Sequence, residues 1–178
     1  MKQEILSNIK DGELFSIAGI EFIKFSDKDG ITTAVAKDML FKSEFGTNNN
    51  FAESIIKERL EKEILPKLEA EIGAENIVEH EVDLLSLDGS DKWGKVNCRI
   101  SLPTLDFYRY NVKIFDKHKL NGWWWLATPD TTSDHYDDNW IRCVSPGGDV
   151  NDSICDDNII GVRPFLTFLS SISISCKK

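Results

Sequence analysis

The clearest pattern along the chain is a set of apolar residues that recurs every fourth position between residues 50 and 72. Its members are Ala52, Ile56, Leu60, Ile64, Leu68 and Ile72, with Ile55 and Leu65 widening the stripe. This spacing predicts one long amphipathic helix with a single buried face. Asn50 and Glu53 have the spacing of a capping box, and Gly73 suits the C-terminal end. Pro66 cannot donate a helical hydrogen bond, so we expect a kink there.

Alternating apolar and polar residues predict strands on both sides of this helix. Residues 14–25 turn at Ala18-Gly19, and residues 31–35 follow the Asp-Lys-Asp-Gly turn at 27–30, which predicts an N-terminal β-meander. After the helix we expect strands at 77–82, 123–127, 140–145 and 160–168, a short helix opened by Ser101-Leu102-Pro103-Thr104, and a last edge strand with Ile172 and Ile174. The predicted fold class is α+β.

Three adjacent tryptophans, Trp123, Trp124 and Trp125, lie in one of these predicted strands. Side chains alternate between the two faces of a strand, so Trp123 and Trp125 share one face and Trp124 takes the other. A single core cannot receive all three rings from one strand. We therefore expect at least one ring to be buried elsewhere, held in a pocket or partly exposed.

Two short segments resemble a known family. They are Trp123 to Pro129, which reads WWWLATP, and Gly161 to Phe165, which reads GVRPF. This pair, separated by a polar stretch rich in Asp, resembles a domain of unknown function common in phages and prophages of Gram-positive bacteria. That domain is similar to the C-type-lectin-like fold of formylglycine-generating-enzyme domains and of the variable proteins of diversity-generating retroelements. The resemblance covers about residues 77–178.

The resemblance implies a small C-type-lectin-like mixed sheet and supplies no activity. With the pattern above, it predicts one domain over residues 1–178, in which 1–76 form the meander and the long helix and 77–178 form the signature region. The length of 178 residues and the hydrophobic content of 41% suit one globular domain. No signal-peptide core and no apolar stretch of membrane-spanning length occurs, so we expect the cytoplasm of a bacterial host cell.

The four cysteines are widely spaced and form no C-x-x-C pair. This spacing lacks the close ligand pairs of zinc and redox motifs, so we expect buried or scattered thiols. A bridge between Cys143 and Cys155, which would close the Asp-rich loop, requires an oxidising environment.

The formal net charge of −9 is concentrated between Pro129 and Asn158. This segment contains one basic residue, Arg142, and eight aspartates: Asp130, Asp134, Asp137, Asp138, Asp149, Asp152, Asp156 and Asp157. Such a surface repels phosphate groups, which argues against nonspecific nucleic-acid binding through this face. A host or phage protein with a basic surface, or a divalent cation, fits it better.

Candidate chemistry is sparse. His135 and His80 are candidate general bases, and Asp134 could orient the imidazole of His135. Asp134, Asp137 and Asp138 are candidate metal ligands, although Asp-rich loops more often form turns. No phosphate-binding loop, G-x-S-x-G or H-E-x-x-H motif is present. We expect no cofactor and leave a divalent cation open.

Arg163 lies within the closing GVRPF strand, so its guanidinium is expected to be at least partly buried. A buried guanidinium needs a carboxylate or several carbonyls around it. We assign Arg163 a structural role and expect it to bind an aspartate such as Asp83, Asp88 or Asp106.

These observations predict a phage or prophage accessory protein that acts as a non-enzymatic macromolecule-binding module through the acidic loop. The candidate binding residues are Trp124, Asp134, Tyr136, Asp137, Asp138 and Trp140. One alternative is an anti-defence protein of the anti-CRISPR type, which would mimic nucleic acid or act as a small nuclease on guide RNA. A further alternative is a carbohydrate-binding module. The sequence does not decide whether any catalysis occurs.

Overall fold

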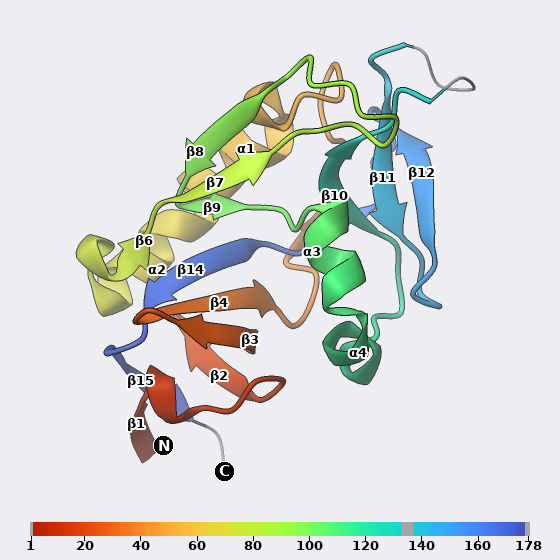
Figure 1. Ribbon diagram of the computed structural model, residues 1–178. Helices are drawn as coiled ribbons and strands as arrows, with labels where there is room; N and C mark the ends of the chain where they lie inside the picture. Colours follow the sequence, from red (N-terminus) through yellow and green to blue (C-terminus); the bar gives the residue numbers. More distant parts are fainter. Residues whose placement is uncertain (1, 133–136, 177–178) are drawn as a thin grey trace.

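A computed structural model describes residues 2–132 and 137–176, and its chain forms two main sheets, a two-stranded ribbon and one long helix (Figure 1). The larger sheet has the order β1-β15-β2-β3-β4-β14-β6, and β9 also pairs with β14. Its strands are β1 (Lys2–Ile5), β2 (Leu14–Ile17), β3 (Ile20–Lys28), β4 (Ile31–Ala36), β6 (Ile77–Val78), β9 (Ile100–Ser101), β14 (Phe165–Leu169) and β15 (Ser173–Cys176). The mixed α+β class predicted from the sequence is confirmed.

The N-terminal meander is present as β2, β3 and β4. Two-residue turns join the strands, because Ile17 pairs with Ile20 and Lys28 pairs with Ile31. Ala18 and Asp29, the first residues of these turns, both have φ of +52°, and the glycines after them are also left-handed. This geometry matches the right-handed twist of the flanking strands, which is why the turns close tight hairpins.

The second sheet contains five strands in the order β12-β11-β10-β13-β5. These are β5 (Phe41–Lys42), β10 (Trp124–Pro129), β11 (Trp140–Val144), β12 (Val150–Ile154) and β13 (Gly161–Val162). The ribbon consists of β7 (His80–Asp83) and β8 (Lys95–Cys98). Trp124 pairs with Gly161 in parallel, so the beginnings of the two signature segments lie side by side.

The prediction of one continuous strand over 160–168 is wrong. β13 ends at Val162 in the second sheet, and β14 begins at Phe165 in the larger sheet, where it pairs with β4. Pro164 has no N–H to offer a ladder, so the chain can leave one sheet at this point and enter the other. β14 also pairs with β6 and β9, so strands from both halves of the chain share this sheet.

The long helix is built from α1 (Ile55–Arg59), a π-helical turn (Leu60–Ile64) and α2 (Leu65–Ile72). The Leu65 N–H donates to the Leu60 carbonyl, five residues back, immediately before Pro66. The kink expected at Pro66 thus takes the form of a π-helical turn, because wider winding accommodates a residue that cannot donate.

The long helix begins with a different capping residue from the one that the sequence predicted. The Ser54 hydroxyl accepts from the Lys57 N–H at 3.0 Å and caps α1. Asn50 accepts from the Ala52 N–H and caps only the preceding 3-10 turn, Phe51–Glu53. The backbone of Ser54 is extended, as is usual for an N-cap residue, so the helical hydrogen bonds of α1 begin at Ser54 and not at Asn50. At the other end, Gly73 has φ of +86° and stops the helix as predicted.

The buried face of the helix agrees with the predicted stripe at its centre. Ile56, Leu60 and Leu68 are fully buried in the main core. Ile55, which was expected to widen the stripe, is 37% exposed. The opposite face carries i,i+4 ion pairs, namely Lys57–Glu61, Glu58–Lys62 and Arg59–Glu63. This face is solvated, as its mixed charges suggest.

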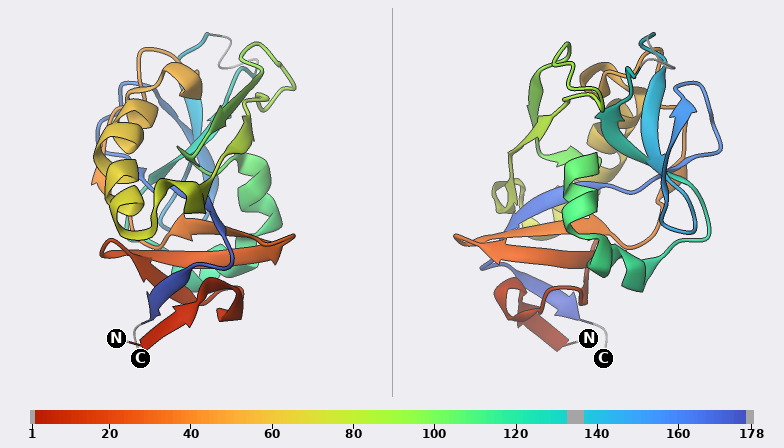
Figure 2. Two further views of the ribbon diagram at one scale, coloured as in Figure 1. Left: turned by 90° about the vertical axis from the view of Figure 1, so that its left-hand side faces the viewer. Right: turned by 45° about the vertical axis from the view of Figure 1, so that its right-hand side comes forward.

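Trp124 and Trp125 point into two separate cores, as strand alternation requires. The Trp125 ring packs edge-on against Phe45 in the main core, and its Nε1 donates to the Ser43 carbonyl at 2.9 Å. The Trp124 ring stacks on Phe115 in a smaller core beneath α3 (Leu105–Tyr110) and α4 (Val112–Phe115). Trp123 is the ring left partly exposed, at 37%. Figure 2 shows α3 and α4 covering this side of the second sheet.

Over residues 2–132 and 137–176, no helix combines the length and the apolar character needed to cross a membrane.

Candidate functional site

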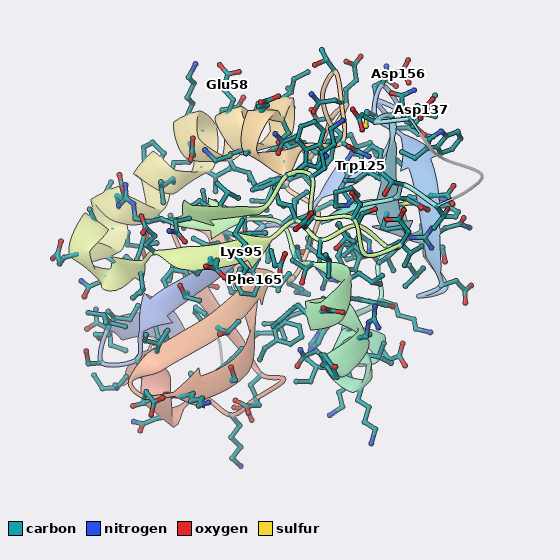
Figure 3. The ribbon with its side chains drawn as sticks, turned by 45° about the horizontal axis from the view of Figure 1, so that its top comes forward. Glu58, Lys95, Trp125, Asp137, Asp156 and Phe165 are labelled. Carbon is teal, nitrogen blue, oxygen red and sulfur yellow. The ribbon has the colours of Figure 1, made fainter. Side chains whose placement is uncertain are left out.

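The aspartates predicted to form a binding surface gather at one end of the β11–β12 hairpin. Asp137 and Asp138 precede β11, and Asp156 follows β12. The antiparallel pairing of Trp140 with Ile154 brings the two loops to the same end of the hairpin. Figure 3 shows Asp137 and Asp156 near each other at the periphery of the molecule. We call these three residues, Asp137, Asp138 and Asp156, the acidic edge.

The charges of the acidic edge act on one buried group, the Cys155 thiol. Burial is the main reason why the pKa of Cys155 is raised to about 12, and the negative charges of Asp156, Asp137 and Asp138 raise it further. Asp138 forms an ion pair with Lys92, whereas Asp137 and Asp156 are exposed side chains. The edge keeps a negative excess toward solvent.

Asn49 holds the acidic edge against the rest of the fold. Its backbone N–H donates to the Asp138 carbonyl at 2.8 Å, and its Nδ2 donates to the Trp140 carbonyl at 2.9 Å. Its Oδ1 accepts from the Trp93 Nε1 at 2.8 Å. Asn49 is fully buried, and its backbone and side chain together join three segments that are far apart in sequence. The sequence gives no local signal for this role, because every partner is distant along the chain.

A second feature missed at the sequence level is a cross-strand triad centred on Arg142. Its Nη1 donates to Asp130 at 2.8 Å and to Asp152 at 3.2 Å. Burial alone would raise the pKa of Asp130, but hydrogen bonds from Thr132 and Arg142 outweigh it and lower that pKa. Arg142, the only basic residue between Pro129 and Asn158, therefore compensates the charges of Asp130 and Asp152. Its charge is thus used beside the acidic edge and not on it.

Two further aspartates stabilise turns. Asp157 accepts from the Ser153 hydroxyl at 2.9 Å and from the Ile159 N–H at 3.1 Å. The Asp149 N–H donates to the Ser145 hydroxyl at 3.1 Å. These contacts are typical of Asx-type and Ser-type turns, so they explain part of the loop composition without a ligand.

Several of the predicted site residues are not part of the acidic edge. Asp134, His135 and Tyr136 lie outside the described residues. Trp124 is only 3% exposed and belongs to the smaller core, which removes it from the residues a partner can touch. Trp140 is partly buried at the start of β11, next to the acidic edge. No group of three His, Cys, Asp or Glu side chains in 2–132 and 137–176 is arranged to hold a metal ion.

His80 is held in a partly buried polar and aromatic setting. Its Nε2 lies 2.8 Å from the Ser101 hydroxyl, and its ring meets Phe165 edge-on at 4.8 Å between centroids. Burial lowers the pKa of His80 to about 4, against a smaller opposing effect of a hydrogen bond with the Val78 backbone. A base of such low pKa has little drive to take a proton at neutral pH.

Arg163 is buried as predicted, at 1% exposure, but the expected carboxylate partner is wrong. Its Nε donates to the Ala36 carbonyl at 2.7 Å, and its guanidinium lies 5.1 Å from the Trp124 ring centroid and 5.2 Å from that of Phe115. Asp83, Asp88 and Asp106 are not among its partners. Burial lowers the pKa of Arg163 to about 10, against a smaller opposing effect of the Asp38 charge, so it remains charged at neutral pH. The Ala36 and His118 carbonyls and two π faces stabilise the guanidinium.

Cys143 and Cys155 are both buried free thiols. The Cys155 N–H donates to the Asn139 carbonyl, which places it opposite Asn139, four positions from Cys143 along β11. At about 3.3 Å per residue this separation exceeds the roughly 7 Å between Cα atoms that a disulfide can span. A disulfide between Cys143 and Cys155, which we considered for an oxidising environment, therefore requires a different backbone conformation from the one observed.

Comparisons of this chain with protein-family models, with curated proteins and with solved structures found no match.

Proposed function

We propose that this chain is a non-enzymatic binding module that holds a basic surface of another macromolecule against its acidic edge. The observation that carries this proposal is the position of Asp137 and Asp156: both are exposed, close to a third carboxylate, and on loops that a rigid hairpin supports. Binding residues often lie on loops that a rigid scaffold positions.

Electrostatics favour a basic partner. Clustered like charges repel one another, and an incoming lysine or arginine relieves that repulsion. Such a surface also accelerates association with a cationic partner at low salt. Asn49 supports the proposal because a fixed loop pays little ordering entropy when a partner binds.

We also propose that the chain is a phage or prophage accessory protein of the bacterial cytoplasm with a C-type-lectin-like fold. The parallel pairing of Trp124 with Gly161 supports this, because the family resemblance implies that the two signature segments share a sheet. The position of β14 in the larger sheet departs from that expectation.

The test is a comparison of proteins captured from host cells by the wild type and by the triple variant Asp137→Asn, Asp138→Asn, Asp156→Asn. A matched control removes three exposed carboxylates from the N-terminal segment, the end of α2 and the end of α4: Asp11→Asn, Glu75→Gln and Asp116→Asn. We expect one basic protein to be retained by wild type and control and lost by the triple variant. Equal retention by all three would contradict the proposal.

The captured protein and the purified chain also distinguish between the alternative functions. An anti-CRISPR inhibitor acting by mimicry would compete with nucleic acid for the captured protein. A nuclease on guide RNA would cut RNA added to the purified chain, and a carbohydrate-binding module would bind glycans rather than protein. The first outcome would identify the basic surface as a nucleic-acid-binding one, and the other two would replace the proposed function with another.

A further inference from the structure

A trough runs along β7, between this strand and the segment that leads into α3. Figure 1 shows where β7 and α3 lie in the fold. It has two hollows, and Thr104 lines both. The first, about 190 Å³, is mainly apolar and is lined by His80, Val82, Leu102, Phe107 and Phe165. The second, about 260 Å³, is polar and is lined by Asp83, Ser86, Asp106, Arg109 and Thr128. Both hollows lie outside the acidic edge.

The border of this trough is an open sheet edge. β7 has β8 as its neighbour in a two-stranded sheet, and no other strand of residues 2–132 and 137–176 pairs with it. The Leu84 N–H donates to the Gly94 carbonyl across the ribbon, which fixes the alternation of the ladder. The backbone N–H and C=O groups of Glu81 and Asp83 consequently point away from β8, and both residues line the trough.

The segment that follows β7 forms one wall of the trough, and hydrogen bonds hold it in place. The Leu87 N–H and the Ser86 hydroxyl both donate to the Pro129 carbonyl, each at 3.1 Å. Leu85 and Leu87 nevertheless expose 43% and 40% of their surface beside the polar hollow. Exposed leucines next to unpaired backbone groups are typical of a surface that receives another chain.

The side chains indicate what that chain carries. The first hollow offers aromatic and aliphatic surface, which suits an apolar side chain. In the second, Asp83 and Asp106 face one guanidinium, Arg109, which already pairs with Asp106 at 3.1 Å. One negative charge remains in excess, so a lysine or arginine side chain complements it.

We propose that β7 accepts an extended peptide of a partner protein as an added strand. Its backbone would pair with Glu81 and Asp83, an apolar side chain would fill the first hollow, and a lysine or arginine would enter the second. This site is separate from the acidic edge and does not depend on it.

The test is selection of random nine-residue peptides against the wild-type chain, followed by measurement of Kd for the best peptide. Glu81→Pro removes the outward N–H without removing a donor that the ribbon uses, and Glu81→Thr is the matched control that keeps this N–H. We expect roughly tenfold weaker binding to the proline variant and less than about twofold change with threonine. Asp83→Asn should weaken only peptides that carry the basic residue.

A second measurement works if the proline variant fails to fold. N-methylation of alternate amides in the selected peptide removes donors from the ligand and leaves the protein intact. We expect one methylation pattern to weaken binding roughly tenfold and the complementary pattern to preserve it. Failure to enrich any peptide, equal affinity for Glu81→Pro and Glu81→Thr in folded protein, or indifference to both methylation patterns would overturn the proposal. Peptides that lose affinity only with the acidic-edge triple variant would overturn it as well.

Discussion

Arg163 illustrates how a buried charge can be stabilised without an ion pair. Its guanidinium lies beside the stacked Trp124 and Phe115 rings and donates to the Ala36 and His118 carbonyls. From the sequence we could predict burial, because the GVRPF segment reads as an apolar strand, but not the partners. The resemblance brings the two signature segments into one sheet, but it does not predict that the Trp124 ring, or the Phe115 ring from α4, contacts Arg163.

Substitutions of Arg163 should separate this arrangement from a hidden ion pair. Arg163→Ala leaves a cavity and an unpaired carbonyl, and we expect a loss of about 3 kcal/mol in the free energy of unfolding. Arg163→Met fills the same space and leaves no buried carboxylate uncompensated, because Asp38, whose charge acts on Arg163, is exposed, so it should cost about half as much. Urea denaturation measures both values. A methionine variant as unstable as the alanine variant would indicate a buried carboxylate partner instead.

His80 makes stability depend on pH. Its pKa in the folded protein, about 4, lies below the value of about 6.5 expected in the unfolded chain. The unfolded state therefore binds more protons between these pH values. The contribution of His80 is fully present above pH 6.5 and is lost as the pH falls toward 4, by about 3 kcal/mol in total. His80→Gln, which keeps hydrogen-bonding capacity without titrating, should flatten the stability profile in this window. An unchanged profile would show that the imidazole is solvated.

At the scale of elements, local patterns were the most informative. The four-residue period identified the long helix and most of its buried face, and the Ala18-Gly19 and Asp29-Gly30 turns identified the meander. The cap was misassigned, because Asn50 and Ser54 both offer a suitable oxygen four residues apart. Local sequence does not reveal that a 3-10 turn precedes the helix.

The two caps can be compared directly. Ser54→Ala should destabilise the protein by about 1–2 kcal/mol, because Ser54 is buried, caps α1 and donates to the Phe51 carbonyl at 2.8 Å. Asn50→Ala should cost less, since it caps one 3-10 turn. Thermal or urea unfolding of both variants measures the difference. A larger loss with Asn50→Ala would restore the capping box at residues 50–53.

The Arg142 triad joins β11 to β12 and to the end of β10. Arg142→Ala leaves Asp130, which is 1% exposed, without its cation, so we expect a loss of about 3–5 kcal/mol at neutral pH. The double change Arg142→Ala with Asp130→Asn should recover part of that loss. The free energies of unfolding test this, and equal instability of the single and double variants would show that packing, not charge, explains the loss.

At the scale of the whole molecule, the sequence was least informative about how sheets share the chain. GVRPF reads as one strand, yet Gly161–Val162 and Phe165–Leu169 belong to different sheets. β14 finds its partners in β4, β6 and β9, which are distant in sequence. The same holds for the candidate site. The acidic composition could be seen in the sequence, whereas the roles of Asn49 and Arg142 and the trough along β7 depend on contacts that only the folded chain creates.

The most direct test of the central claim is the salt dependence of binding to the captured partner. Kd is measured at 50 and 300 mM NaCl for the wild type, for the Asp137, Asp138, Asp156 triple Asn variant and for the distant-carboxylate control. Salt screens exposed charges, so wild type and control should weaken by roughly tenfold or more over this range. The triple variant should bind weakly at both concentrations, with little change between them, while its melting temperature stays equal or rises. A steep salt dependence retained by the triple variant would contradict the acidic edge as the binding surface.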